Sequence, residues 1–103
     1  MTVYVDDMMM RADVPNGNRV VRGIWCHMFA DTREELDAMA DRIGMRRSWI
    51  QKPGTPREHY DVTKSRREAA IKAGAVVLPI RSKEWLEFFE KKAEAARAQR
   101  EHV

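Results

Sequence analysis

His59-Tyr60-Asp61 places an imidazole and a carboxylate two positions apart. In extended backbone such side chains share one face, so His59 and Asp61 should point the same way, while Tyr60 points into or over the fold. Together the two groups can bind a divalent metal ion, or they can act as a general acid and base, because histidine titrates near neutral pH. In a purely structural alternative, His59 anchors its loop and the charge of Asp61 supports the helix that follows.

A positively charged helix start comes next. We expect a helix to begin at Thr63, where free backbone N–H groups and the positive end of the helix dipole favour an anion such as phosphate. Trp49, which is flanked by basic residues, is the aromatic side chain best suited to stack on a base. The predicted ligand-binding residues are Trp49, Gln51, Tyr60, Lys64, Arg66 and Arg67.

Further metal-binding residue types occur elsewhere in the chain. His27 and Asp31 would extend the first pair to two nitrogen and two oxygen ligands, and Asp6 or Asp7 would add a carboxylate. Such a donor set suits zinc, manganese or iron. The spacing matches no recognised metal motif, and a histidine within a strand is more often a core residue with a backbone or carboxylate partner. The metal hypothesis names as ligands His27, Asp31, His59, Asp61 and Asp6.

Composition limits the class of protein. The chain has 103 residues, enough for one compact domain, and its 44% hydrophobic and 34% charged residues indicate a soluble globular protein. No apolar run approaches the roughly 20 residues of a membrane span. The first residues lack the basic and apolar regions of a secretory signal. Cys26 is the only cysteine, so no disulfide can form within the chain, which fits a reducing cytoplasm.

The net charge of +3 is unevenly distributed. Residues 1–41 carry four basic and eight acidic side chains, residues 42–83 carry eleven and three, and residues 84–103 carry four and five. The positive charge therefore lies in the middle segment, where it suits nucleic acid or a phosphorylated ligand. An ordinary solvated surface explains the same charges equally well.

Local patterns predict alternating strands and helices. We expect strands over residues 2–6, 19–30, 45–51 and 75–80. Residues 8–18 should form a loop or loose hairpin, because Asn16-Gly17 suits positive φ. We expect helices from the Thr32 cap to Ile43, from Thr63 to Ala73, and from the Ser82 cap onward. The last of these should fray from Ala95.

This order predicts an α/β fold: a single small domain with a three- to four-stranded parallel or mixed sheet, crossover helices and a C-terminal amphipathic helix. Residues 1–81 should form the α/β core, and residues 82–103 a helix packed on it and frayed at its end. Ligands in open α/β sheets bind at the carboxyl ends of strands. The residues expected to converge there are Asp6, Asp7, Asp31, Gln51, His59 and Asp61.

Several short motifs follow one another in residues 3–80, among them Tyr4-Val5-Asp6, Trp25-Cys26-His27-Met28, Arg47-Ser48-Trp49, His59-Tyr60-Asp61 and Ala73-Gly74-Ala75. In these motifs the chain resembles small bacterial and phage proteins catalogued as domain of unknown function forty thirty-one. The loop with Met8 to Met10 and the long final helix look like departures from that family. The resemblance implies relatives and brings no mechanism with it.

Three functions fit the sequence. The favoured one is binding of a phosphate-bearing ligand, nucleic acid or nucleotide, at the strand carboxyl ends. The second is a metal-dependent phosphoesterase or nuclease that uses the His/Asp set. The third is a non-enzymatic phage or bacterial accessory protein that binds a host protein through Met8 to Met10 or the final helix. The expected location is the cytoplasm of a bacterium or of a phage-infected cell, without membrane association.

Overall fold

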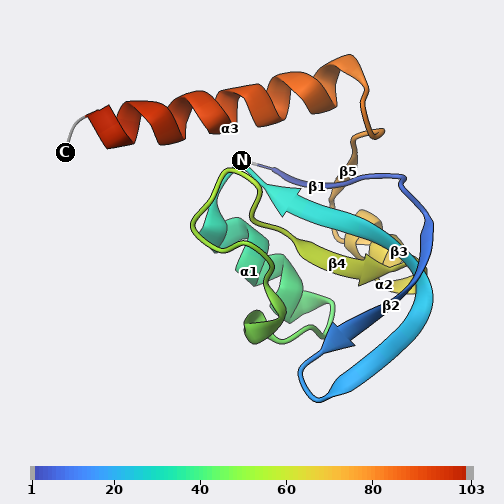
Figure 1. The fold of residues 1–103 in the computed structure, drawn as a ribbon. Helices are drawn as coiled ribbons and strands as arrows, with labels where there is room; N and C mark the ends of the chain where they lie inside the picture. The colour runs from blue at the N-terminus through green and yellow to red at the C-terminus, as the bar shows by residue number, and fades with distance from the viewer. Residues whose placement is uncertain (1, 102–103) are drawn as a thin grey trace.

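The computed structural model describes residues 2–101, which form a five-stranded mixed sheet and three α-helices (Figure 1). The strands are β1 (Val3–Val5), β2 (Met10–Asn16), β3 (Arg19–Ala30), β4 (Tyr60–Thr63) and β5 (Val76–Val77). The helices are α1 (Arg33–Arg42), α2 (Lys64–Lys72) and α3 (Lys83–Glu101), with a 3-10 turn, η1, at Arg47–Trp49. The α/β class and the mixed sheet are confirmed.

Strand β3 is the centre of the sheet, because it has partners along both edges. Trp25 pairs with Met10 of β2 on one side and with Thr63 of β4 on the other. Further along β3, Met28 likewise lies between β1 and β4. Strands β1 and β2 therefore follow the same edge of β3, and β4 follows the opposite edge.

Strand direction decides which ends meet. Strands β1, β2 and β4 each run antiparallel to β3, and β5 runs parallel to β1. Helix α2 thus connects two strands, β4 and β5, that run the same way with β3 and β1 between them, as predicted for a crossover helix. The carboxyl end of β3 lies at the opposite end of the sheet from the carboxyl end of β1.

One face of the sheet carries the main apolar core. Side chains of alternate residues on β1, β3 and β4 point to it and are covered by α1 and α2 (Figure 1). The core residues include Val5, Cys26, Met28, Leu36, Ala40, Tyr60, Val62 and Ala70. Thr32 caps α1 by accepting a hydrogen bond from the Glu35 backbone N–H, as the sequence predicts.

Helix α3 covers part of the other face, on the far side of the sheet from α1 and α2 (Figure 1). Its Phe88 and Phe89 rings lie 5.1 Å and 4.9 Å from Phe29 of β3. Each such aromatic pair contributes about 0.5–1.5 kcal/mol beyond the area it buries. Ser82 caps the helix by accepting from the Trp85 N–H, which agrees with the predicted start.

Two predicted strands differ in the structure, and one predicted hairpin is regular. Residues 8–18, expected as a loop or loose hairpin, contain strand β2, which the two-residue turn at Gly17 and Asn18 joins to β3 in a hairpin, so the sheet has five strands where three or four were expected. The strand expected at 45–51 is absent from the described residues: η1 occupies its middle, and only Gln51 forms a bridge, to His59. The strand expected at 75–80 is two residues long, and Pro79, which has no N–H to donate, follows it closely.

The final helix is regular to Glu101, beyond the Ala95 position from which we expect fraying. The last two residues of that expected tail lie outside the described residues. In residues 2–101, no helix combines the length and the apolar character that crossing a bilayer requires.

Candidate functional site

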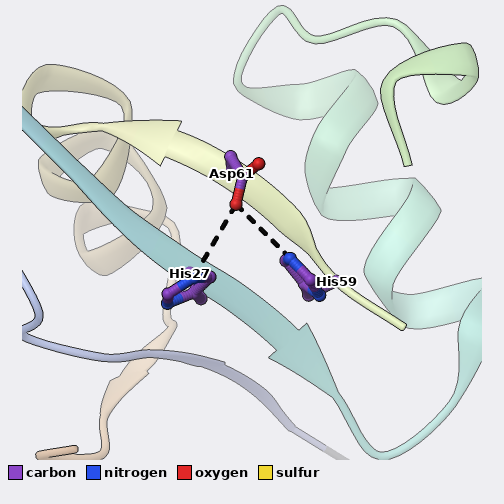
Figure 2. A group of neighbouring side chains, drawn as sticks. All are labelled: His27, His59 and Asp61. Atoms are coloured by element: carbon purple, nitrogen blue, oxygen red, sulfur yellow. Dashed lines mark ion pairs between the residues drawn. The ribbon is translucent and has the colours of Figure 1, made fainter. Parts of the chain in front are cut away.

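The candidate site lies on the face of the sheet that points away from the main core. His59 and Asp61 share this face, whereas Tyr60 between them is fully buried on the other, as predicted from their spacing. His27 of β3 pairs directly with Asp61 of β4, so its side chain points to the same face. Figure 2 shows the two histidines on either side of Asp61.

The three side chains lie close enough to share one ion. Asp61 Oδ1 is 3.8 Å from His27 Nε2 and 3.4 Å from His59 Nε2 (Figure 2). One ligand atom from each residue lies within 4.8 Å of the other two. Ligands bound tetrahedrally at about 2.0–2.1 Å are roughly 3.4 Å apart. Small side-chain adjustments would therefore bring all three to bonding distance of one metal ion.

Each histidine is held by its other ring nitrogen. His27 Nδ1 lies 2.7 Å from Asp6 Oδ2, and His59 Nδ1 lies 2.7 Å from the Arg57 carbonyl oxygen. A carbonyl oxygen only accepts hydrogen bonds, so His59 Nδ1 carries the proton and the neutral ring has its lone pair on Nε2. Metal-binding histidines typically have this arrangement, in which a carboxylate or carbonyl fixes the ring.

Asp6 is a buried carboxylate that is built into the site. It accepts hydrogen bonds from the backbone N–H groups of His27 and Met8, and Arg67 donates to its carbonyl oxygen at 2.7 Å. Burial alone would raise the pKa of Asp6, but its bonds to the ring and backbone of His27 outweigh this and lower that pKa below its ordinary value. The hydrogen bond between the Asp6 carboxylate and the His27 ring also raises the pKa of His27.

The two histidines line a pocket of about 260 Å³ between the sheet and the start of α3. Its rim carries three cationic side chains, those of Lys52, Arg57 and Arg81. Trp85 and Phe89 of α3 form an apolar wall, and the Arg57 guanidinium lies over the Phe89 ring at 5.1 Å. The pocket therefore places positive charge beside His27 and His59, two of the three residues of the candidate metal centre, whereas Asp61 is not among its lining residues.

Two of the pocket residues have an uncommon backbone conformation. Lys52 has a φ of 50° and Arg81 a φ of 62°, in the left-handed region that non-glycine residues seldom adopt. The Arg81 segment is fixed by a hydrogen bond from the Ile80 N–H to Asp7. Such strain is often stored at functional sites, where surrounding contacts hold it.

The structure corrects the expectation that Asp31 joins this group. Asp31 follows the carboxyl end of β3, and because β3 is antiparallel to β1 it lies near the start of β1 instead. Its carboxylate accepts hydrogen bonds from the Thr2 N–H and the Tyr4 hydroxyl. Asp31 is four positions after His27 along extended backbone, a distance of roughly 13 Å. Asp31 therefore ties the first strand to the end of β3.

The structure also corrects the prediction that Tyr60 faces a ligand. Tyr60 has no exposed surface, and its hydroxyl donates to Asp37 of α1 at 2.6 Å. Burial and this hydrogen bond raise the pKa of the Tyr60 hydroxyl well above its ordinary value. Tyr60 joins β4 to α1 beneath the sheet.

The other predicted ligand-binding residues do not form one site. Gln51 exchanges two backbone hydrogen bonds with His59 and so positions that residue. Arg67 holds Asp6, whereas Lys64 is exposed at the first position of α2. Trp49 and Arg66 meet elsewhere, with the Arg66 guanidinium 5.5 Å above the Trp49 ring.

Sequence reasoning missed how the pocket is completed. Trp85 and Phe89 resemble core residues of an amphipathic helix, and only the chain path brings them opposite the histidines. The basic side chains were visible as part of the positive middle segment, but nothing in their spacing distinguishes Lys52, Arg57 and Arg81 from the other cations. Nothing in the sequence indicates that the backbone carbonyl of Arg57 accepts the hydrogen bond from the His59 ring.

Residues 3–92 match the family described as Protein of unknown function (DUF4031). The suspected resemblance is thus confirmed over most of the chain. Neither the curated proteins nor the solved structures provide a match.

Proposed function

The chain belongs to the DUF4031 family, and from the geometry of the candidate site we propose that it binds one divalent transition-metal ion. We further propose that it hydrolyses a phosphate ester beside that ion. The proposed ligands are His27 Nε2, His59 Nε2 and the Asp61 carboxylate. One observation carries the proposal: both histidines are fixed through Nδ1, and both present Nε2 to the same carboxylate.

The donor set favours a catalytic site over a structural one. Structural zinc sites are usually closed by four protein ligands, whereas catalytic sites keep at least one position for water or substrate. Two imidazoles and one carboxylate suit Zn²⁺, Fe²⁺ or Mn²⁺ and leave such positions open. When bound, an ion of this kind supplies Lewis acidity and lowers the pKa of a coordinated water.

The pocket around the histidines supports an anionic substrate. Lys52, Arg57 and Arg81 lie on its rim, and its one acidic residue, Asp6, already interacts with His27. A volume of about 260 Å³ suits a small ester or a terminal phosphate group. In the proposed reaction these cations hold and orient the phosphoryl group, and the wall from Trp85 excludes bulk water.

Metal binding is tested by titrating metal-free protein with Zn²⁺ and Mn²⁺ in a calorimeter. Wild type should bind one ion, whereas His59→Gln and Asp61→Asn should each weaken binding at least about tenfold, since each removes a ligand. Asp31→Asn is the matched control, because it removes a carboxylate that the structure places outside the centre. Absence of binding by wild type, or equal affinity in all variants, rejects the metal centre.

Hydrolysis is tested separately with p-nitrophenyl phosphate and bis(p-nitrophenyl) phosphate. Turnover by metal-loaded wild type that disappears in Asp61→Asn supports the proposal. Metal binding without turnover of either compound keeps the metal centre and rejects phosphate-ester hydrolysis.

A second candidate is binding of a phosphate-bearing ligand without chemistry, and the three cations on the rim favour it independently of any metal. Titration of chelator-treated protein with inorganic phosphate and with AMP separates the two. Binding that survives removal of metal and is weakened by Lys52→Gln supports the second candidate.

We also propose that the protein works in the cytoplasm. Cys26, the chain's one cysteine, is free and fully buried in the core. A reducing compartment suits such a thiol. Fractionation of cells that express the full chain tests this location.

A further inference from the structure

A second pocket, of about 600 Å³, lies away from the histidines and shares none of its lining residues with the first. It is bounded by the β2–β3 turn at Gly17, by η1 and by the first turn of α2. Trp49 is one of its lining residues, and the Arg66 guanidinium carbon lies over the Trp49 ring, 5.5 Å from its centroid. We call it the Trp49 groove.

The Trp49 groove gathers positive charge from separate parts of the chain. Arg19 comes from the start of β3, Arg46 precedes η1, and Arg66 belongs to α2. No acidic residue lines the groove, and within residues 2–101 none of these arginines forms an ion pair with a carboxylate. Gathering like charges without counterions raises the free energy of the folded state, and an anionic ligand would offset this cost.

The Trp49–Arg66 pair is held in place. The Trp49 ring packs partly against the apolar core, and the Arg66 backbone N–H is bonded to the helix cap Thr63. The guanidinium of Arg66 also donates a weak hydrogen bond to the Gly44 carbonyl at 3.5 Å. A pre-positioned aromatic ring and guanidinium plane provide stacking surfaces for a nucleobase.

We propose that the Trp49 groove binds single-stranded nucleic acid. A base stacks on the Trp49–Arg66 pair, and the flanking phosphates contact Arg19 and Arg46. Arginines on three segments suit a strand with successive phosphates better than one free phosphate. This site does not depend on the metal centre, because no residue is common to the two.

Fluorescence anisotropy with labelled oligo(dT) and oligo(rU) of about ten nucleotides tests the proposal. With two phosphate contacts, at Arg19 and Arg46, the log–log salt dependence for a single strand should have a slope of about −1.4, so affinity should fall roughly sevenfold between 50 and 200 mM salt. Arg19→Gln and Arg46→Gln should each make the slope shallower by about 0.7. Arg97→Gln, on α3, is the matched control and should bind as wild type.

Stacking is tested at Trp49. Trp49→Ala should weaken binding about 5- to 150-fold, while Trp49→Phe, which keeps an aromatic face, should lose less. Because Trp49 also touches the core, Arg66→Gln provides a second test on a side chain outside it. His59→Gln should bind the oligonucleotides normally, which distinguishes this groove from the metal centre.

Oligonucleotide binding that the groove substitutions weaken supports the proposal, and DNA and RNA probes show which strand is preferred. Three results overturn it: no binding at low salt, binding that none of these substitutions changes, or saturable binding of AMP or dTMP with none of either oligonucleotide.

Discussion

Three hydrogen bonds join Asp6 and His27, although they are 21 residues apart in the sequence, and one of them runs from the Asp6 backbone N–H to the His27 carbonyl oxygen at 3.0 Å. Asp6 Oδ2 lies 2.7 Å from His27 Nδ1, and Asp6 Oδ1 accepts from the His27 backbone N–H at 2.9 Å. One carboxylate thus fixes both the strand and the ring, and it leaves Nε2 near Asp61. We expected Asp6 to bind the metal ion directly. Its position instead suits it to orient His27, one of the proposed metal ligands.

Asp6→Asn should weaken metal binding by about 10- to 100-fold without removing a ligand atom. The amide still accepts from the His27 backbone N–H, but its NH₂ group cannot accept the Nδ1 proton, so the ring loses its fixed tautomer. Calorimetric titration with Zn²⁺ measures the effect. Affinity equal to that of wild type would show that Asp6 has no part in orienting His27.

Tyr60→Phe should destabilise the fold by about 1–3 kcal/mol and leave metal affinity unchanged. The substitution removes the buried hydroxyl that donates to Asp37 at 2.6 Å, and because Arg33 still donates to both Asp37 oxygens, the cost is that of one buried hydrogen bond to a charged group. Urea unfolding gives the stability, and metal titration gives the affinity. A large loss of metal affinity in a folded Tyr60→Phe variant would contradict this prediction and show that Tyr60 contributes to metal binding.

The stability that the protonated Tyr4 hydroxyl provides should be lost at alkaline pH. Burial, followed by the charge and hydrogen bond of Asp31, raises the pKa of Tyr4. A raised pKa means that the folded state favours the protonated hydroxyl, so the contribution is complete below the unfolded value near 10 and is lost as pH rises through the folded value. Urea unfolding of wild type and Tyr4→Phe from about pH 8 to 11 should therefore give converging stabilities. A constant difference contradicts this assignment.

Lys52→Gln and Arg81→Gln should raise KM for a phosphate ester while metal affinity stays within about twofold, because both side chains lie on the pocket rim and neither contacts a proposed ligand atom. Steady-state kinetics on metal-loaded protein provides the measurement. Lys83→Gln, an exposed cation at the start of α3, is the control. An unchanged KM in both variants would show that Lys52 and Arg81 do not contribute to substrate binding.

The parts of the site that depend on local geometry were predictable. A spacing of two places His59 and Asp61 on one face of a strand wherever that strand lies, and Tyr60 necessarily points the other way. Thr32 and Thr63 cap their helices through contacts within three residues. These features need no knowledge of distant partners.

The parts that depend on long-range pairing were not predictable. Asp31 was expected to join Asp6 on the assumption that strand carboxyl ends meet, and the antiparallel pairing of β1 with β3 instead places Asp31 opposite Thr2, at the amino end of β1. That same pairing brings Asp6 to His27. The orientation of paired strands depends on the whole fold. The residues around His27 therefore could not predict where Asp31 lies or that Asp6 contacts His27.

Long-range ¹H–¹⁵N NMR spectra of the histidine rings, recorded before and after equimolar Zn²⁺ is added, report which ring nitrogen binds. We predict large shifts of Nε2 in His27 and His59, with Nδ1 of both rings still protonated and bonded to Asp6 and the Arg57 carbonyl. Unchanged Nε2 resonances in either histidine, or coordination through Nδ1, would contradict a metal centre built from His27, His59 and Asp61.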